Sequence, residues 1–132
     1  MTVSDVKGCR FLVVEDEALI AVLIEDALVG MGCEIVGPTG RLDTAMQLAN
    51  EGEFDAAILD ITIRGGKVYP IAELLVARGI PFAFASGYSD WALPEALRDQ
   101  PRLIKPFTPR ALGEQIRALC VEVAKGRRKD AA

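Results

Sequence analysis

The chain has 132 residues, 51% of them hydrophobic, and a formal net charge of −4, which fits one globular domain and argues against nucleic acid as the main partner. It contains no histidine, which excludes Ser-His-Asp and Cys-His catalysis and most zinc sites. The three cysteines, Cys9, Cys33 and Cys120, include no Cys-x-x-Cys pair and are expected to be buried thiols in a reducing cytoplasm.

Two strand–helix units are predicted in the first half of the chain. Residues 9–14 (CRFLVV) form an apolar run of strand length, and residues 34–37 (EIVG) form a second. Apolar residues at helical spacing follow each strand, over 20–28 after the acidic segment EDE and over 45–49. Glycines end both helical patterns, as is common at the ends of helices.

Three further units are predicted in the second half. Apolar runs of strand length occur at 55–60, 81–86 and 102–105. A helical stripe follows the first of these, and a long stripe that starts near Pro109 follows the last. The interval between the last two strands is short, and Pro94 would break a helix there, so the fourth helix is expected to be short or mobile.

Five βα units in succession predict an α/β domain with one parallel sheet and helices on both faces. The doubly wound strand order 2-1-3-4-5 is expected, and ligands bind such sheets at the carboxyl ends of the strands. The domain is predicted to span residues 8–125. Residues 1–7 are expected to be an N-terminal extension and residues 126–132 a polar, disordered tail. No apolar run reaches the roughly 18 residues of a membrane span.

Polar residues follow four of the predicted strands at the point where each strand ends. Glu15 and Asp16 end the first strand, and Asp60 ends the third. In the expected strand order these three acids meet in one crevice, with Ser86 and Lys105 on its far side. Three crowded carboxylates repel one another, and their oxygen-only set suits Mg²⁺.

A magnesium ion, a lysine and a hydroxyl together would stabilise a phosphoryl group on an aspartate. Each residue alone also has an ordinary interpretation. The acids could begin a helix, Asp60 could cap a loop, Ser86 could form a turn with the next glycine, and Lys105 could be an edge lysine. These separate interpretations do not explain why all of them stand at strand ends.

Four motifs in order resemble the receiver domain of bacterial two-component response regulators, over residues 8–124. They are LVVEDE (the acidic pair), AILDI (the phosphoacceptor), FAFASG (the hydroxyl switch) and LIKPF (the lysine-proline motif). The segment IPFAFASGY also resembles the PFxFATGY signature of the FAT GUY subclass, with Ser86 where threonine is usual. The resemblance implies a flavodoxin-like (βα)5 three-layer sandwich.

The resemblance also implies a role for each residue of the site. Asp60 would accept a phosphoryl group from a phosphohistidine of a kinase, and Ser86 and Lys105 would bind its oxygens. A cis peptide between Lys105 and Pro106 is implied as well, whereas cis accounts for only about 5–6% of X–Pro bonds in general.

The magnesium ligands are implied in the same way. Asp16 would coordinate Mg²⁺ directly and Glu15 through water, and Asp60 would be a further ligand. The backbone carbonyl of Thr62 would complete the protein's contribution.

The sequence departs from the common receiver pattern around the switch. Arg102 stands where most receivers carry an aromatic residue, and the loop after Asp60 lacks the proline that many receivers have. Two aromatic residues, Tyr88 and Trp91, follow the switch hydroxyl. We expect residues 88–100 to be mobile without phosphate and to order into a partner-binding surface on phosphorylation; a rigid loop with Trp91 in the core is the alternative.

The expected function is that of a single-domain, cytoplasmic response regulator, a monomer or weak dimer that signals by protein–protein contact as a relay shuttle, phosphate sink or partner switch. Its phosphodonor would be a sensor histidine kinase, by association of the HWE type, and its downstream protein is unknown. No nucleic-acid or membrane partner is expected. A small aspartyl-phosphate phosphatase is one alternative, although Thr62 stands where such enzymes need a second acid. A receiver that is never phosphorylated is the other.

Overall fold

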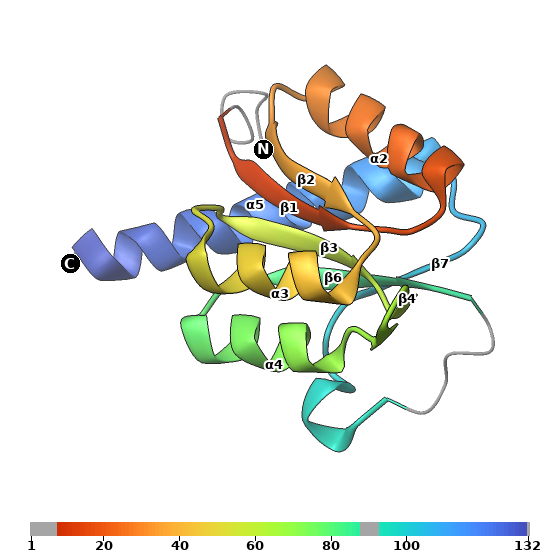
Figure 1. Ribbon diagram of the computed structural model, residues 1–132. Helices are drawn as coiled ribbons and strands as arrows, with labels where there is room; N and C mark the ends of the chain where they lie inside the picture. The colour runs from red at the N-terminus through yellow and green to blue at the C-terminus, as the bar shows by residue number, and fades with distance from the viewer. Residues whose placement is uncertain (1–7, 88–92, 132) are drawn as a thin grey trace.

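The computed structural model describes residues 8–87 and 93–131 (Figure 1). Five parallel strands form its central sheet in the order β2-β1-β3-β6-β7, which is the predicted order 2-1-3-4-5. The strands are β1 (Arg10–Val14), β2 (Glu34–Thr39), β3 (Ala56–Asp60), β6 (Phe82–Ser86) and β7 (Arg102–Ile104). The predicted α/β sandwich is therefore confirmed.

Helices cover both faces of the sheet. They are α2 (Ala18–Gly30), α3 (Leu42–Glu51), α4 (Tyr69–Arg78) and α5 (Pro109–Ala131). Figure 1 shows α2 and α5 on one face of the sheet and α3 and α4 on the other. Each pair encloses its own apolar core, so the molecule has three layers.

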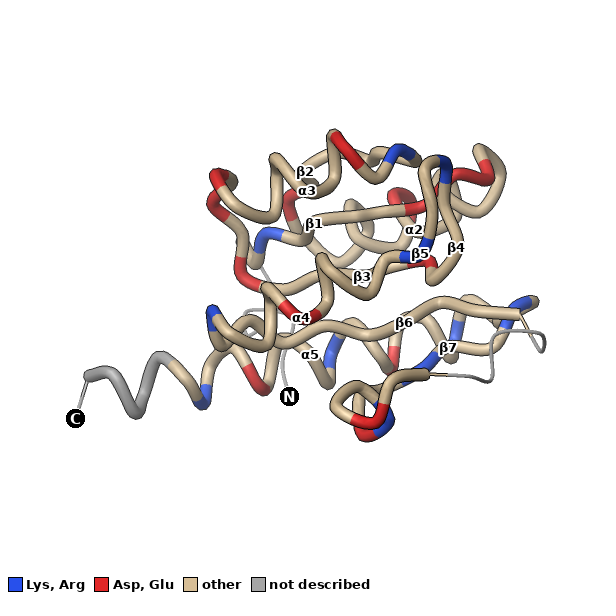
Figure 2. The backbone as a smooth tube through the Cα atoms, turned by 60° about the horizontal axis from the view of Figure 1, so that its bottom comes forward, with Lys and Arg blue, Asp and Glu red and all other residues tan. Residues whose placement is uncertain are grey.

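The central strands are apolar on both faces because both faces are covered by helices. Every residue of β3 and β6 is buried. Successive residues face opposite cores: Ile58 packs under α2 and α5, and Leu59 packs under α3 and α4. Figure 2 shows that charged residues lie mainly on the helices and loops, while β6 carries none.

Single residues mark the end of α4 and the start of α5, at the positions that the sequence predicts. Gly79 takes a φ of 70°, the left-handed conformation that suits glycine, and ends α4. Thr108 precedes α5 and caps its N-terminus, since its hydroxyl accepts a hydrogen bond from the Ala111 N–H at 3.0 Å. Cys9, Cys33 and Cys120 are buried thiols, as predicted, and burial raises the pKa of Cys33 to about 11.

In the part of the interval before β7 that the structure describes, residues 93–101, the chain forms a short 3-10 turn, η1 (Glu95–Leu97). Leu93 and Leu97 are buried in the core under α3 and α4 and anchor this stretch. Tyr88 and Trp91 lie outside the described residues, so the mobility of residues 88–100 stays a prediction.

Two features differ from the sequence analysis. A hairpin of β4 (Thr62–Ile63) and β5 (Gly66–Lys67) follows β3, in strands too short to predict from periodicity. The helix α5 also continues to Ala131, through the segment expected to be a disordered tail. Lysine, arginine and alanine dominate that segment, and all three favour helix. No helix among the described residues has both the length and the apolar character of a membrane span.

Candidate functional site

The carboxyl ends of the parallel strands lie at one edge of the sheet and bring the predicted residues there. Glu15 directly follows β1, and Asp60 is the last residue of β3. Ser86 is the last residue of β6, and Lys105 directly follows β7. In the register of β3 and β6, Asp60 lies opposite Ala85, one residue before Ser86.

Three carboxylates converge at this edge. Glu15, Asp16 and Asp60 each offer an oxygen, and these oxygens lie within 4.8 Å of one another. Glu15 and Asp60 are buried, with 4% and 5% of their surface exposed, while Asp16 is exposed. The Glu17 N–H donates to Glu15 Oε2 at 3.1 Å, and the Thr62 N–H donates to Asp60 Oδ1 at 3.4 Å. These backbone bonds orient the two buried acids.

Lys105 reaches into the same cluster. Its Nζ lies 2.8 Å from Glu15 Oε1 and 3.3 Å from Asp60 Oδ2, with 14% of the side chain exposed. The Lys105 N–H donates to the Ser86 carbonyl at 2.8 Å, which joins the two strand ends. The peptide between Lys105 and Pro106 is cis, so that prediction is confirmed.

One lysine does not neutralise three acids, and the pKa values show this. Burial, together with the neighbouring Glu15 and against the attraction of Lys105, raises the pKa of Asp60 to about 8. Burial alone lowers the pKa of Lys105, but its contacts with Glu15 and Asp60 outweigh burial and raise it. The cluster therefore favours an additional cation.

The Ser86 hydroxyl has no partner among the described residues. The side chain is fully buried, and its Oγ makes no hydrogen bond within the described part of the chain. A buried polar atom without a partner costs about 1–3 kcal/mol, so such groups call for an explanation. A ligand held beside Asp60 would supply one.

The donor set at this edge fits magnesium. All three converging groups are carboxylates, and hard oxygen ligands are those that Mg²⁺ prefers. Asp16 is exposed and able to take a hydrated ion, while Glu15 and Asp60 are buried beside it. These residues could hold the ion at the mouth of the site.

The remaining predicted residues lie around this centre. Thr62 is exposed in β4, and its hydroxyl accepts a hydrogen bond from Lys67 Nζ at 2.7 Å. Arg102 begins β7 and is partly exposed, as expected for a charged side chain in place of an aromatic one. The predicted switch residues Tyr88 and Trp91 fall outside the described residues.

Two residues near the centre were not predicted as site residues. Glu17 Oε1 lies 3.4 Å from Lys105 Nζ, which makes it a third acid on that lysine. It stands in the acidic segment EDE, so the sequence carried a signal for it. Lys67 belongs to the hairpin, whose formation no sequence pattern indicated.

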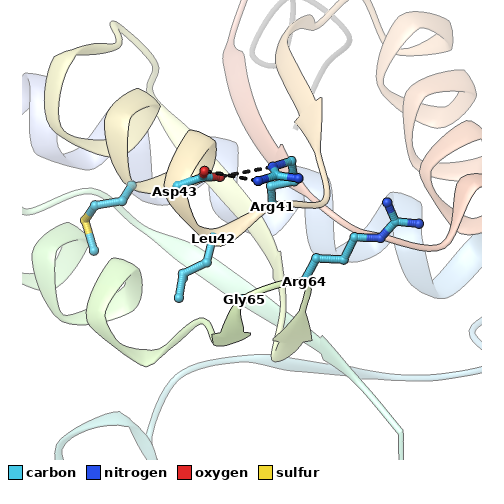
Figure 3. Close-up of a pocket in the computed structure, with 6 residues that line it drawn as sticks. Arg41, Leu42, Asp43, Arg64 and Gly65 are labelled. Carbon is cyan, nitrogen blue, oxygen red and sulfur yellow. Dashed lines mark hydrogen bonds and ion pairs between the residues drawn. The ribbon is translucent and has the colours of Figure 1, made fainter.

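A separate hollow of about 520 Å³ lies beside the site, between the start of α3 and the β4–β5 hairpin (Figure 3). Its lining comprises Arg41, Leu42, Asp43, Met46, Arg64 and Gly65. Figure 3 shows the side chains of Arg41 and Asp43 pointing toward one another, and their closest approach is 3.2 Å. None of the predicted site residues that the structure describes belongs to this lining.

Comparison with known proteins gives similar solved structures, although no protein-family model matches the sequence. SdrG from Sphingomonas melonis Fr1 is 42% identical, with a TM-score of 0.75, and the match covers 90% of this chain and 98% of that one. The response regulator PhyR from Brucella abortus is 28% identical, with a TM-score of 0.71, and covers 92% of this chain and 53% of that one.

Curated relatives are longer proteins. The transcriptional regulatory protein PdtaR from Mycobacterium tuberculosis is 33% identical over 103 residues, which make up 75% of this chain and 50% of that protein. The chain spans about half the length of the curated relatives it matches. The similarity therefore concerns the domain described above.

Proposed function

The chain belongs to the receiver-domain family of response regulators, and from this premise we propose that it accepts a phosphoryl group on Asp60 and signals by contacts with other proteins. One observation carries the proposal: a buried aspartate, a lysine, two further acids and a buried hydroxyl that has no partner among the described residues share one edge of the sheet. Phosphoryl transfer develops negative charge on the phosphoryl oxygens, and the lysine, the hydroxyl and a cation held by the acids would stabilise that charge.

In the proposed reaction, an Asp60 carboxylate oxygen forms the new bond to phosphorus. The bond between phosphorus and the donor's imidazole nitrogen breaks, and the imidazole leaves with the electron pair. The Lys105 ammonium lies 3.3 Å from Asp60 and would bind one phosphoryl oxygen. The Ser86 hydroxyl would donate to another, which gives this buried group its missing partner.

The acids would hold a divalent cation beside the acceptor. We assign Asp16 as a direct ligand and Glu15 as a ligand through water, with Asp60 and the Thr62 carbonyl completing the set. A bound magnesium ion supplies positive charge for the phosphoryl oxygens. Burial and Glu15 raise the pKa of Asp60, and the positive charge of a bound ion would lower it again, so that Asp60 is ionised and nucleophilic.

The phosphodonor we propose is a sensor histidine kinase of the HWE type, and the subclass is FAT GUY. The segment IPFAFASGY, which contains Ser86 at the end of β6, supports this assignment. A phosphatase is disfavoured, since the position two residues after Asp60 is the neutral Thr62.

Intact-mass analysis with acetyl phosphate tests the proposal directly. The protein should gain one phosphoryl group when Mg²⁺ is present and none in chelator, because the acids need the cation to approach a phosphate dianion. Peptide mapping of the adduct should find it on Asp60. A protein that stays unmodified with both acetyl phosphate and a phosphorylated kinase would instead be a receiver that is never phosphorylated.

Magnesium should also raise the melting temperature of the protein. A ligand at ten times its Kd adds about 1.4 kcal/mol to the folded state, or roughly 5 °C for a domain of this size. Asp16→Ala should remove most of that rise, because Asp16 is the exposed acid of the cluster. Asp43→Ala is the control, since Asp43 pairs with Arg41 outside the cluster. An equal rise in wild type and Asp16→Ala would contradict the assigned ligand set.

A further inference from the structure

Residues 39–42 connect the last residue of β2 to the first residue of α3, and they contact both the end of β1 and the β4–β5 hairpin; we call this segment the crossing loop. A bulge in β2 comes directly before this loop. Leu12 pairs with Val36 but Val14 pairs with Thr39, so β2 carries one extra residue there. Such bulges redirect a strand locally. The crossing loop therefore lies between the two loops that carry the acids of the site.

Main-chain hydrogen bonds hold the crossing loop on both sides. On the β1 side, the Glu15 N–H donates to the Thr39 carbonyl at 2.9 Å. On the hairpin side, the Arg64 N–H donates to the Gly40 carbonyl at 3.0 Å, and the Leu42 N–H donates to the Arg64 carbonyl at 2.8 Å. The path of the loop is thus fixed at three points.

Gly40 is the point where the crossing loop passes Asp16. A Cβ added at Gly40 would lie 2.6 Å from the Asp16 Cα, 2.8 Å from the Asp16 Cβ and 3.2 Å from the Glu15 carbonyl oxygen. A Cβ atom does not approach main-chain atoms this closely in folded proteins. Any side chain at Gly40 must therefore displace either the crossing loop or Asp16.

Of the two, we expect Asp16 to move and the crossing loop to stay. The crossing loop is held by the three hydrogen bonds described above, and its Leu42 packs closely on Gly65 of the hairpin. Asp16 instead is exposed and precedes a helix whose N-terminus has no side-chain cap. A larger residue at Gly40 is therefore expected to shift Asp16, whose Cα and Cβ lie closest to the added atom.

We propose that Gly40 is a positioning residue for Asp16, and that the absence of its side chain lets Asp16 stand where it binds a divalent cation. This inference rests on the proposed function, because it concerns the same metal site. Groups that orient a metal ligand typically change metal affinity by about 10-fold to 100-fold. Gly40→Ala should weaken Mg²⁺ binding within that range.

Isothermal titration with Mg²⁺ measures this effect without phosphorylation. Gly30→Ala is the matched control, because a Cβ at Gly30 meets nothing within 4 Å, and it should bind Mg²⁺ as the wild type does. With acetyl phosphate, Gly40→Ala should need more Mg²⁺ for half-maximal phosphorylation and should reach the wild-type rate within about twofold at saturation. In the Asp16→Ala background, Gly40→Ala should have no further effect on Mg²⁺ binding.

The outcomes separate this inference from the proposed function. If the wild type shows no Mg²⁺ binding, the proposed function itself fails. If the wild type binds Mg²⁺ and Gly40→Ala binds it equally well, Gly40 does not position Asp16. A positioning role predicts that the loss of Mg²⁺ affinity acts through Asp16. The inference is therefore also overturned if Gly40→Ala lowers Mg²⁺ affinity just as much in the Asp16→Ala background. It is overturned as well if the Gly40→Ala protein does not fold at saturating Mg²⁺.

Discussion

Asp60→Asn is expected to abolish the phosphoryl adduct from acetyl phosphate at any Mg²⁺ concentration. An amide has no anionic oxygen to attack phosphorus. Asp60 is the acid of the cluster that lies on the strand paired with β6, whose last residue is Ser86, and its Oδ2 lies 3.3 Å from Lys105 Nζ. Intact-mass analysis measures the result. Asp43→Asn, at an exposed acid outside the cluster, should be phosphorylated like the wild type.

The same substitution should alter the pH dependence of stability in metal-free buffer. The folded protein raises the pKa of Asp60 from 3.8 to about 8, so the folded state holds its proton more tightly than the unfolded state. Below pH 4, Asp60 is protonated in both states and does not destabilise the fold. As pH rises to about 8, ionisation favours the unfolded state and the free energy of unfolding falls. Asp60→Asn should remove that loss, which urea unfolding in chelator at a series of pH values can detect. An adduct on Asp60→Asn, or an unchanged pH profile, would count against the assignment.

Lys105→Met is expected to have two effects of opposite sign. Phosphorylation should fall by about 100-fold or more, because a preorganised charge for the phosphoryl oxygens is lost. Mg²⁺ binding should tighten, because the Lys105 ammonium contacts Glu15 at 2.8 Å and Asp60 at 3.3 Å and so competes with the metal for these acids. Methionine keeps the apolar length of the side chain and removes only the charge.

The two effects are measured separately, by initial phosphorylation rates and by Mg²⁺ titration. Lys125→Met serves as the control, since Lys125 is an exposed residue of α5 that pairs with Glu122. It should leave both quantities unchanged. If Lys105→Met weakens Mg²⁺ binding, then Lys105 supports the metal site through structure and does not compete for the acids.

The strands and their order could be predicted because their sequences allow few alternatives. Runs such as AAILD are apolar on both faces, which only a covered parallel strand tolerates, and β3 falls within one residue of its predicted start. The site followed from the same reasoning, since parallel strands place their ends together. Asp60 and Lys105 are 45 residues apart in sequence yet 3.3 Å apart in space for this reason.

Other features depend on tertiary contacts that a sequence pattern does not carry. The β4–β5 hairpin has two residues in each strand, too few for an alternating pattern. The need for glycine at position 40 arises from Asp16, 24 residues earlier, and becomes visible only when the crossing loop is placed. The end of α5 differs from the prediction because the helix propensity of its lysine, arginine and alanine residues outweighs the tendency of a charged chain end to fray.

The hydrogen bond from the Lys105 N–H to the Ser86 carbonyl has a mechanical consequence. It ties the main chain of Ser86 to that of Lys105, the two residues proposed to bind the phosphoryl group, so a displacement of the Ser86 backbone either breaks this bond or carries Lys105 and the end of β7 with it. Leu93 and Leu97, which lie between these two residues in the sequence, are both held in the core under α3 and α4. A displacement at the tied ends would thus be opposed by Leu93 and Leu97, which anchor the described part of the connection between β6 and β7 in that core.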